Sequence, residues 1–362
     1  MSVATCAEQF AETAKPIAEM LKTERHKAKA EKLKFDFSIS AFQDVSVLKE
    51  SVSAFQNFSV SKESFSFAVR NYDLAATLAC GQAFRWTQRH SGWSGVVNGH
   101  WIELQQRDET ISVRTAAPIS DWRWLEDYLQ LRVDLTAVLA TFPDDDPMRR
   151  AIAACRGLRL LRQNPWECLA SFILSSTKQI VQIRQIIATL CQRHGEPVAV
   201  PAGEADAFAF PTPERIAALS EAELRDCKMG FRAPNLLNAA RKIAAGEFDL
   251  GALRDRELSA ARESLLTLPG VGPKIADCVL LFSLGFPTAF PVDVWVVKAL
   301  QCSYFRNRRV NLATLREFSS TRFGPNGGYA QQYLFHAIRL EDRKNLSPAA
   351  RQPVASVNGL PG

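Results

Sequence analysis

The sequence contains no apolar run that approaches the roughly 20 consecutive residues that a membrane-spanning helix requires. Its eight cysteines include no C-x-x-C pair, and no secretory signal precedes them. These absences argue against a membrane protein and against a small secreted domain held together by disulfides. The cysteines are therefore expected to be reduced and mostly buried, in a protein that works inside the cell.

The composition that is present fits a folded polypeptide with a polyanionic partner. Hydrophobic residues make up 47% of the 362 residues, which is enough to bury a core, and the length allows two domains with tails. Lysine and arginine outnumber the acids by 44 to 38, which gives a net charge of +6. That excess suits nucleic acid, although ordinary solubility accounts for a charge of this size equally well.

Two predicted helices joined by a short glycine turn are the most informative feature of the chain. Residues 257–267 have apolar side chains at helical spacing, and a second apolar helix is predicted over residues 274–284. The turn between them reads Pro269-Gly-Val-Gly272. Such a turn directs the amides of Gly270 and Gly272, together with the positive end of the second helix, toward an anion such as a nucleic-acid phosphate.

Lys274 and Asp293 are the candidate catalytic residues. Lys274 lies in the first turn of the second predicted helix, beside the expected phosphate site, where a neutral amine could act as a nucleophile. Asp293 precedes a predicted helix over residues 294–300, whose amides would hold the carboxylate ionised beside a centre of developing positive charge. The structural alternatives are a solvated helix lysine and a helix N-cap.

Four segments are predicted along the chain, and together they give an α+β protein. Residues 1–65 form an extension, disordered or loosely helical, in which a short sequence that begins at Ser40 recurs at Ser53. Residues 66–150 form an antiparallel β-sheet domain, residues 151–344 are helical, and residues 345–362 are a disordered tail. The strand candidates are 84–86, 93–97, 100–105 and the neighbourhood of Ile111, with Asn98-Gly99 as a hairpin turn.

Five separated motifs resemble the helix–hairpin–helix DNA glycosylases, and among them the 8-oxoguanine DNA glycosylase branch, over residues 72–340. In chain order they are Cys80-Gly-Gln-Ala-Phe-Arg-Trp86, Leu160-Leu-Arg-Gln-Asn-Pro-Trp-Glu-Cys168, Leu268-Pro-Gly-Val-Gly-Pro-Lys-Ile-Ala-Asp-Cys278, Pro291-Val-Asp-Val294 and Gly328-Tyr-Ala-Gln-Gln-Tyr-Leu-Phe335. The resemblance implies an N-terminal antiparallel β-sheet domain followed by an all-α helix–hairpin–helix glycosylase domain. It implies a bifunctional DNA glycosylase and AP lyase of base excision repair, which excises 8-oxoguanine by lysine attack on the sugar C1′ and cuts the strand by β-elimination.

The same resemblance implies a role for each site residue. Lys274 is the nucleophile, and Asp293 stabilises positive charge on the sugar. The extruded base is expected against Gly81, Cys278, Gln331 and Phe335, with the Gly81 carbonyl accepting the hydrogen that 8-oxoguanine carries on N7. The duplex is expected against Gly270, Gly272, Ile275, Phe231, Arg232, Thr177 and Lys178, where Phe231 inserts into DNA and Arg232 reads the orphaned cytosine. The chain departs from the family pattern at Thr177, Gln182, Trp295 and Ile338, so strict pairing with cytosine is not expected.

Neither a metal nor an organic cofactor is expected for this chemistry, although the family pattern allows a monovalent cation between the hairpin carbonyls and a phosphate. Related branches bind an iron–sulfur cluster through four closely spaced cysteines, whereas Cys302 is the only cysteine beyond Asp293. The expected partner is double-stranded DNA containing 8-oxoguanine, bound by a monomer in a nucleus or in a bacterial cytoplasm. A non-catalytic DNA-damage binding protein and a hydrolytic alkyl-base glycosylase, which lacks the lysine, are the alternatives.

Overall fold

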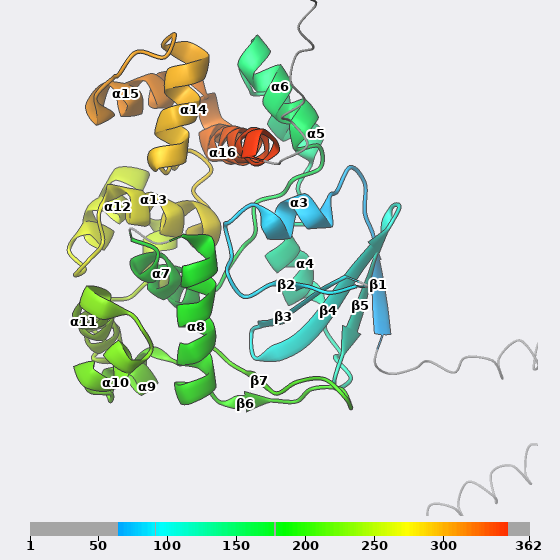
Figure 1. Cartoon of the computed structure of the whole chain (residues 1–362), viewed down its shortest axis with the longest axis vertical. Coiled ribbons are helices and arrows are strands. Elements are labelled where there is room, and N and C mark those ends of the chain that lie inside the picture. Colours follow the sequence, from blue (N-terminus) through cyan, green and yellow to red (C-terminus); the bar gives the residue numbers. More distant parts are fainter. Residues whose placement is uncertain (1–63, 91, 177–178, 347–362) are drawn as a thin grey trace, which may run out of the picture. The chain divides into compact units, whose positions relative to one another are not determined.

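The computed structural model describes residues 64–346 apart from residues 91, 177 and 178. Its first part is a five-stranded antiparallel sheet with the strand order β1-β5-β4-β3-β2 (Figure 1). The strands are β1 (Ser64–Ala68), β2 (Thr87–Gln88), β3 (Trp93–Val97), β4 (His100–Arg107) and β5 (Thr110–Thr115). In β5 the side chains of Ile111 and Val113 are buried and that of Ser112 between them is exposed, so one face of this strand meets the core.

The predicted β-hairpin is confirmed, and the strand predicted at residues 84–86 is wrong. Asn98 and Gly99 have positive φ angles of 49° and 77°, as the two central residues of a type I′ turn require. Residues 84–86 do not pair with another strand, and β2 begins at Thr87. The side chains of Phe84 and Trp86 belong to separate cores. Phe84 packs on Phe172 among the helices, whereas Trp86 packs in the core of the sheet.

Two short helices pack against the apolar side chains of the sheet. They are α3 (Leu74–Ala79) and α4 (Arg123–Leu129), and their leucines share one buried cluster with Ile102 and Leu104 of β4. Neither helix was predicted, because elements of six and seven residues contain too few turns for a helical period to show in the sequence.

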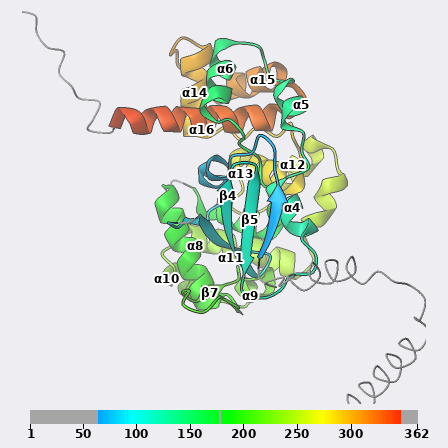
Figure 2. The same ribbon diagram turned by 90° about the vertical axis from the view of Figure 1, so that its right-hand side faces the viewer.

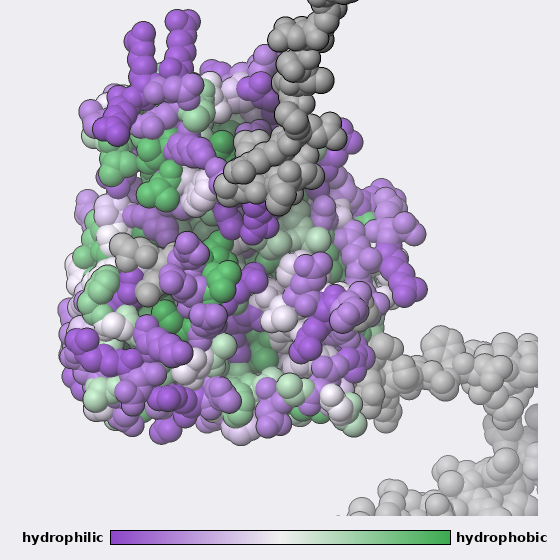
Figure 3. Space-filling model, in the orientation of Figure 1, coloured by the Kyte–Doolittle hydropathy of each residue, from purple (hydrophilic) through white to green (hydrophobic). Residues whose placement is uncertain are grey.

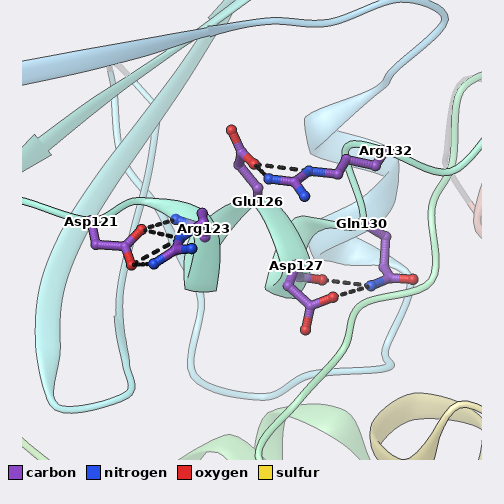
Figure 4. A network of polar contacts seen from close by, with 6 residues as sticks. All are labelled: Asp121, Arg123, Glu126, Asp127, Gln130 and Arg132. Carbon is purple, nitrogen blue, oxygen red and sulfur yellow. Dashed lines mark hydrogen bonds and ion pairs between the residues drawn. The ribbon is translucent and has the colours of Figure 1, made fainter.

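The outer side of α4 carries a network of polar contacts (Figure 4). Arg123 pairs with Asp121 at 2.6 Å, and hydrogen bonds from this guanidinium lower the pKa of Asp121 to about 2. Gln130 adopts a left-handed conformation at the helix end and donates to the carbonyl of Asp127 at 2.6 Å. Exposed ion pairs of this kind contribute little to stability. The network lies at the two ends of α4 and indicates no functional site.

The rest of the described chain is mainly helical, and Figure 2 shows α16 running along α6, α14 and α15. A small sheet of β6 (Pro197–Val198) and β7 (Ala207–Phe208) follows α8. The helices are α5 (Leu135–Leu139), α6 (Asp146–Ala154), α7 (Pro165–Leu174), α8 (Ile180–His194), α9 (Pro213–Ala217), α10 (Glu221–Asp226), α11 (Ala233–Ala244), α12 (Leu258–Leu266), α13 (Pro273–Val279), α14 (Val294–Tyr304), α15 (Leu312–Arg322) and α16 (Gly327–Leu346). No described helix is both long and apolar enough to cross a membrane.

Several helix boundaries follow the capping signals in the sequence. The Asn164 side chain accepts hydrogen bonds from the amides of Trp166 and Glu167 at 3.0 and 3.1 Å, and so begins α7. Ser220 and Glu223 form the predicted capping box of α10. A single π turn over Leu280–Leu284 prolongs α13 as far as Gly285, so the predicted second hairpin helix is present in full length.

The sheet and helical parts meet earlier in the sequence than composition suggested. The predicted border at residue 150 lies inside α6, and Leu135 of α5 and Met148 of α6 belong to the core of the helices. Cys80, which follows α3, is buried in the same helical core. Strand β1 likewise begins at Ser64, two residues before the predicted start of the sheet part at residue 66.

Removal of residues 1–61 is expected to leave a folded protein, because the compact unit begins at Lys62. Removal of residues 1–68 should instead lower the free energy of unfolding by about 3 kcal/mol or more, since it deletes β1 and the buried Phe67 ring. The test is to compare the thermal unfolding of the two truncated chains with that of the full chain. A large loss of stability on removal of residues 1–61 would show that the extension packs against the rest of the protein.

Candidate active site

The predicted glycine hairpin joins α12 to α13. Gly270 has a φ of 76°, and a Cβ at this position would lie 2.7 Å from the side chain of Asn235, so both conformation and space require glycine. A Cβ at Gly272 would meet nothing within 4 Å, so no contact with a described residue explains this glycine. An ion pair of 2.7 Å between Arg262 and Asp277 fastens the two hairpin helices together.

The start of α13 leaves few amides for a ligand. Gly272 is its N-cap and has no side chain to offer, while Pro273 has no amide hydrogen. The first intrahelical bond runs from Ala276 to the carbonyl of Gly272 at 2.9 Å, so the amides before it belong to Lys274 and Ile275. The Ile275 side chain is buried, so its predicted contact with DNA can involve only its backbone.

Lys274 is held by the last turn of α7. Its Nζ atom donates to Ser175 Oγ at 3.2 Å and lies 5.0 Å from the centre of the Phe172 ring. Ser175 Oγ in turn donates to the carbonyl of Phe172 at 2.7 Å, which leaves a lone pair on this oxygen for the amine. The packing of α7 on α13 therefore determines where the nitrogen lies.

Asp293 is the N-cap of α14, as predicted. Its Oδ1 atom accepts hydrogen bonds from the amides of Trp295 at 3.0 Å and Val296 at 2.9 Å. Burial nevertheless raises the pKa of this carboxyl above its usual value, and the two amides and the charge of Lys274 oppose that rise. The expectation that the amides dominate is therefore corrected, because loss of solvent has the larger effect.

Cys278 lies one turn after Lys274 on α13 and is buried. Burial raises the pKa of its thiol to about 12, with Lys274 acting to lower it and Asp293 acting to raise it. The thiol is therefore neutral at physiological pH. Lys274, Cys278 and Asp293 influence one another electrostatically, which brings the two catalytic candidates and one base-contact candidate into a single region.

Gly81 lies on a loop that its neighbour Gln82 anchors. The buried Gln82 side chain donates to the carbonyls of Thr77 at 2.9 Å and Arg159 at 2.8 Å, and it accepts from the amide of Leu161 at 2.8 Å. Gly81 itself has a φ of 88°, and a Cβ there would lie 3.0 Å from Ile180. The loop after α3 is thereby fixed against the start of α8.

Helix α16 presents two more predicted residues to the same loop. Gln331 is buried, and its Oε1 atom has no hydrogen-bond partner among the described residues. Phe335 lies one turn later, and its ring would be 3.6 Å from a Cβ at Gly81. The adjacent Gln332 donates to the carbonyl of Cys80 at 3.2 Å, so of the two neighbouring amides Gln331 is the one with a free acceptor for a ligand.

The predicted contacts to the opposite strand are brought together only in part. Phe231 is 61% exposed, as an inserting ring should be, and the Arg232 guanidinium lies 4.2 Å from its centre. Arg232 itself is buried and donates to the carbonyls of Ser176 and Met229. Thr177 and Lys178 lie outside the described residues.

Sequence reasoning missed the residues that orient the catalytic candidates. Ser175, Phe172 and Gln82 act through contacts with segments far along the chain, and no spacing rule connects them with Lys274 or Gly81.

A separate cavity of about 660 Å³ lies beside Tyr72 and Trp93 and includes none of the predicted site residues. Within the described part of the chain, no group of three or more histidine, cysteine or acidic side chains could bind a metal ion.

Two family profiles together match most of the described chain. Residues 64–169 match the family described as 8-oxoguanine DNA glycosylase, N-terminal domain. Residues 170–320 match the family described as HhH-GPD superfamily base excision DNA repair protein. This range contains the glycine hairpin, Lys274 and Asp293. The fold and the site thus define a helix–hairpin–helix protein of the base-excision superfamily.

Individual relatives narrow the assignment, and the chain belongs to the 8-oxoguanine DNA glycosylase family. The N-glycosylase/DNA lyase OGG1 of Arabidopsis thaliana is 32% identical over 304 residues, which cover 78% of this chain and 81% of the relative. A probable N-glycosylase/DNA lyase of Methanothermobacter thermautotrophicus is 32% identical over 233 residues, 59% of this chain and 72% of the relative.

A solved structure supports the same assignment and confirms the predicted fold class. It is the 8-oxoguanine glycosylase/lyase of Clostridium acetobutylicum in complex with double-stranded DNA containing cytosine opposite to 8-oxoguanine. It superimposes with a TM-score of 0.74 at 30% identity, over 78% of this chain and 97% of that one. The order of an antiparallel sheet followed by a helix–hairpin–helix part is therefore that of the family.

Proposed function

We propose that this protein is a bifunctional DNA glycosylase and AP lyase of base excision repair, which excises 8-oxoguanine from duplex DNA and acts as a monomer inside the cell. The observation that supports this most strongly is the position of the Lys274 amine: it lies at the start of the second hairpin helix, donates to Ser175 and acts with its charge on the carboxyl of Asp293. A hydrolytic glycosylase that activates only water has no need of this lysine. A binding protein needs neither group.

The chemistry begins with the deprotonated amine of Lys274. Its nitrogen bonds to C1′ of the damaged nucleotide as the bond between C1′ and the base breaks, and the base leaves with the bonding electrons and takes up a proton. The carboxylate of Asp293 stabilises the positive charge that develops on the sugar. Opening of the sugar ring gives a Schiff base, which makes the C2′ hydrogen acidic, and loss of this proton expels the 3′ phosphate.

Four residues from three elements recognise the base: Gly81 on the loop after α3, Cys278 on α13, and Gln331 and Phe335 on α16. The Gly81 carbonyl accepts the hydrogen on N7 of 8-oxoguanine, where guanine has only a lone pair and would be repelled. Gln331 has a free amide oxygen to pair with the base edge. Phe335 and Cys278 contact its two faces, and the neutral thiol places no second negative charge beside Asp293.

The duplex is held by the hairpin and by the loop before α11. The amides of Gly270, Gly272 and Ile275 bind a phosphate without regard to sequence. The exposed ring of Phe231 fills the space that the extruded base leaves, and Arg232 turns toward the orphaned base. Thr177 and Lys178 complete the contact with the opposite strand.

Excision should be only modestly faster opposite cytosine than opposite thymine, guanine or adenine. Gln182 is uncharged where the family pattern has an arginine, and the Arg232 guanidinium already donates to the carbonyls of Ser176 and Met229, so charged recognition of the opposite base is weakened. One lost charged contact is worth about 1.5–3 kcal/mol, or roughly one to two orders of magnitude in discrimination. Single-turnover rates on four duplexes that differ only in the opposite base measure this. A cytosine preference above roughly a thousandfold, beyond what one such contact supplies, would refute the argument.

Borohydride trapping on three duplexes tests the proposed activity. Duplexes with 8-oxoguanine, with guanine and with an alkylated purine at the same position are incubated with the full chain and reductant. A covalent complex that forms only with 8-oxoguanine is the expected result. Release of the alkylated base without a covalent complex would favour a hydrolytic glycosylase, and tight binding of damaged DNA without base release would favour a binding protein.

A further inference from the structure

One face of α16 runs from the proposed base contacts to the protein surface. Gln331, Phe335, Arg339 and Arg343 follow one another at intervals of four residues and therefore share this face. Gln331 is buried, Phe335 and Arg339 are partly exposed, and Arg343 is exposed. The first two are the proposed contacts of the extruded base, so the two arginines lie outward of it along the same helix.

Arg339 borders the proposed base contacts. Its guanidinium carbon is 5.1 Å from the centre of the Phe335 ring, and one of its nitrogens is 3.5 Å from the carbonyl oxygen of Cys80. The same nitrogen would be 3.2 Å from a Cβ at Gly81. The guanidinium thus borders both the stacking ring and the glycine proposed to recognise the lesion.

Helix α8 brings a third arginine to the same region. Ile180 in its first turn would lie 3.0 Å from a Cβ at Gly81, and Arg184 is one turn further along the same face. The Nε atom of Arg184 is buried and has no hydrogen-bond partner among the described residues. The charge of Arg343 acts on both Arg184 and Arg339, so the three guanidinium groups form one cluster, called here the rim arginines.

The rim arginines form no ion pair with an acid among the described residues, although the charge of Asp293 acts on Arg339 from a greater distance. None of the three has a described carboxylate oxygen within 4.0 Å, whereas Arg85, Arg114 and Arg262 elsewhere each form an ion pair. Burial and mutual repulsion lower the pKa of Arg339 and Arg184. Like charges gathered here without an ion-pair partner within 4.0 Å repel one another, and the binding of an anion relieves this repulsion.

We infer that Arg339, Arg343 and Arg184 bind a backbone phosphate next to the extruded nucleotide and so hold the lesion in the pocket. A nucleotide whose base lies against Gln331 and Phe335 has its sugar and phosphates on the outward side, and Arg339 is about 6 Å further along the helix axis than Phe335. Guanidinium groups suit phosphate because they can donate two parallel hydrogen bonds. The inference rests on the proposed function, because it needs an extruded nucleotide.

The salt dependence of DNA binding tests this inference. The probe is a duplex with a tetrahydrofuran abasic analogue opposite cytosine, which the enzyme cannot cleave, and fluorescence anisotropy gives Kd over a series of salt concentrations. R339A, R343A and R184A are each expected to reduce the magnitude of the slope of log K against log salt, by at most the roughly 0.9 that one neutralised phosphate contributes, and to weaken binding about tenfold or more at low salt. R339K should retain most of the slope, because it keeps the charge. R107A, at the exposed end of β4, is the matched control and should change little.

Two results would overturn the inference. One is that R339A and R343A unfold at the same temperature as the wild type and bind DNA with the same salt slope. The other is an equal loss in R107A, which would mean that total charge, not position, is responsible. Borohydride trapping by the wild type decides the proposed function separately, so an active enzyme whose R339A variant keeps its slope would refute only the phosphate site.

Discussion

Lys274→Gln is expected to abolish both base release and borohydride trapping while duplex binding stays within a few-fold of the wild type. The glutamine side chain has no nucleophilic amine, so the covalent step cannot occur. Binding should persist because the phosphate contacts come from the hairpin amides and not from this side chain. Single-turnover excision rates should fall by several orders of magnitude, since removal of a nucleophile leaves only the remaining binding contributions.

Ser175→Ala is the matched control for this substitution, because it removes the hydroxyl that orients the amine but leaves the amine in place. It should slow excision and still allow trapping. Covalent trapping by Lys274→Gln at the wild-type rate would exclude Lys274 as the nucleophile.

Asp293→Asn should slow base release about a hundredfold or more, which is the cost of removing one electrostatic contact to the transition state. Its effect on folding should be small, because asparagine caps helices about as well as aspartate. Asp293→Ala, in contrast, also removes the acceptor for the amides of Trp295 and Val296 and should cost about 0.5–2 kcal/mol of stability. Single-turnover kinetics and thermal unfolding of the two variants distinguish the catalytic effect of the Asp293 charge from its structural effect as a helix cap.

The acidic side of the pH–rate profile gives a second measure of the same carboxyl. Because burial raises the pKa of Asp293, base release in the wild type should begin to fall at a higher pH than an exposed aspartate would give. The raised pKa also means that the folded state binds this proton more tightly than the unfolded state. The contribution of Asp293 to stability is therefore largest at low pH and is lost as pH rises through the folded-state pKa. Asp293→Asn should remove both effects. An unchanged rate and profile would leave Asp293 with only its structural role as a cap.

Features that depend on a few neighbouring residues could be predicted from the sequence. The Asn98-Gly99 turn, the Asn164 cap and the Asp293 cap follow from local hydrogen bonding, and the structure confirms each of them. The glycine hairpin belongs to the same class, because Gly270 is required by its own φ angle. These are short-range constraints, and a sequence displays them directly.

Features that depend on contacts between distant segments could not be predicted in this way. The strand prediction at residues 84–86 fails because Phe84 and Trp86 pack into two different cores. Ser175 gains its place only when α7 packs on α13, and Arg339 only when α16 passes the Gly81 loop. On the face that Figure 3 shows, apolar residues appear as separate patches among hydrophilic ones.

Identification of the trapped residue is the most direct test of the mechanism. The wild-type protein is incubated with an 8-oxoguanine duplex and borohydride, the covalent complex is digested with nuclease and protease, and the modified peptide is sequenced by mass spectrometry. The proposed mechanism predicts that the residual sugar fragment lies on Lys274. A fragment on another lysine or on the N-terminal amine, with Lys274 unmodified, would contradict it.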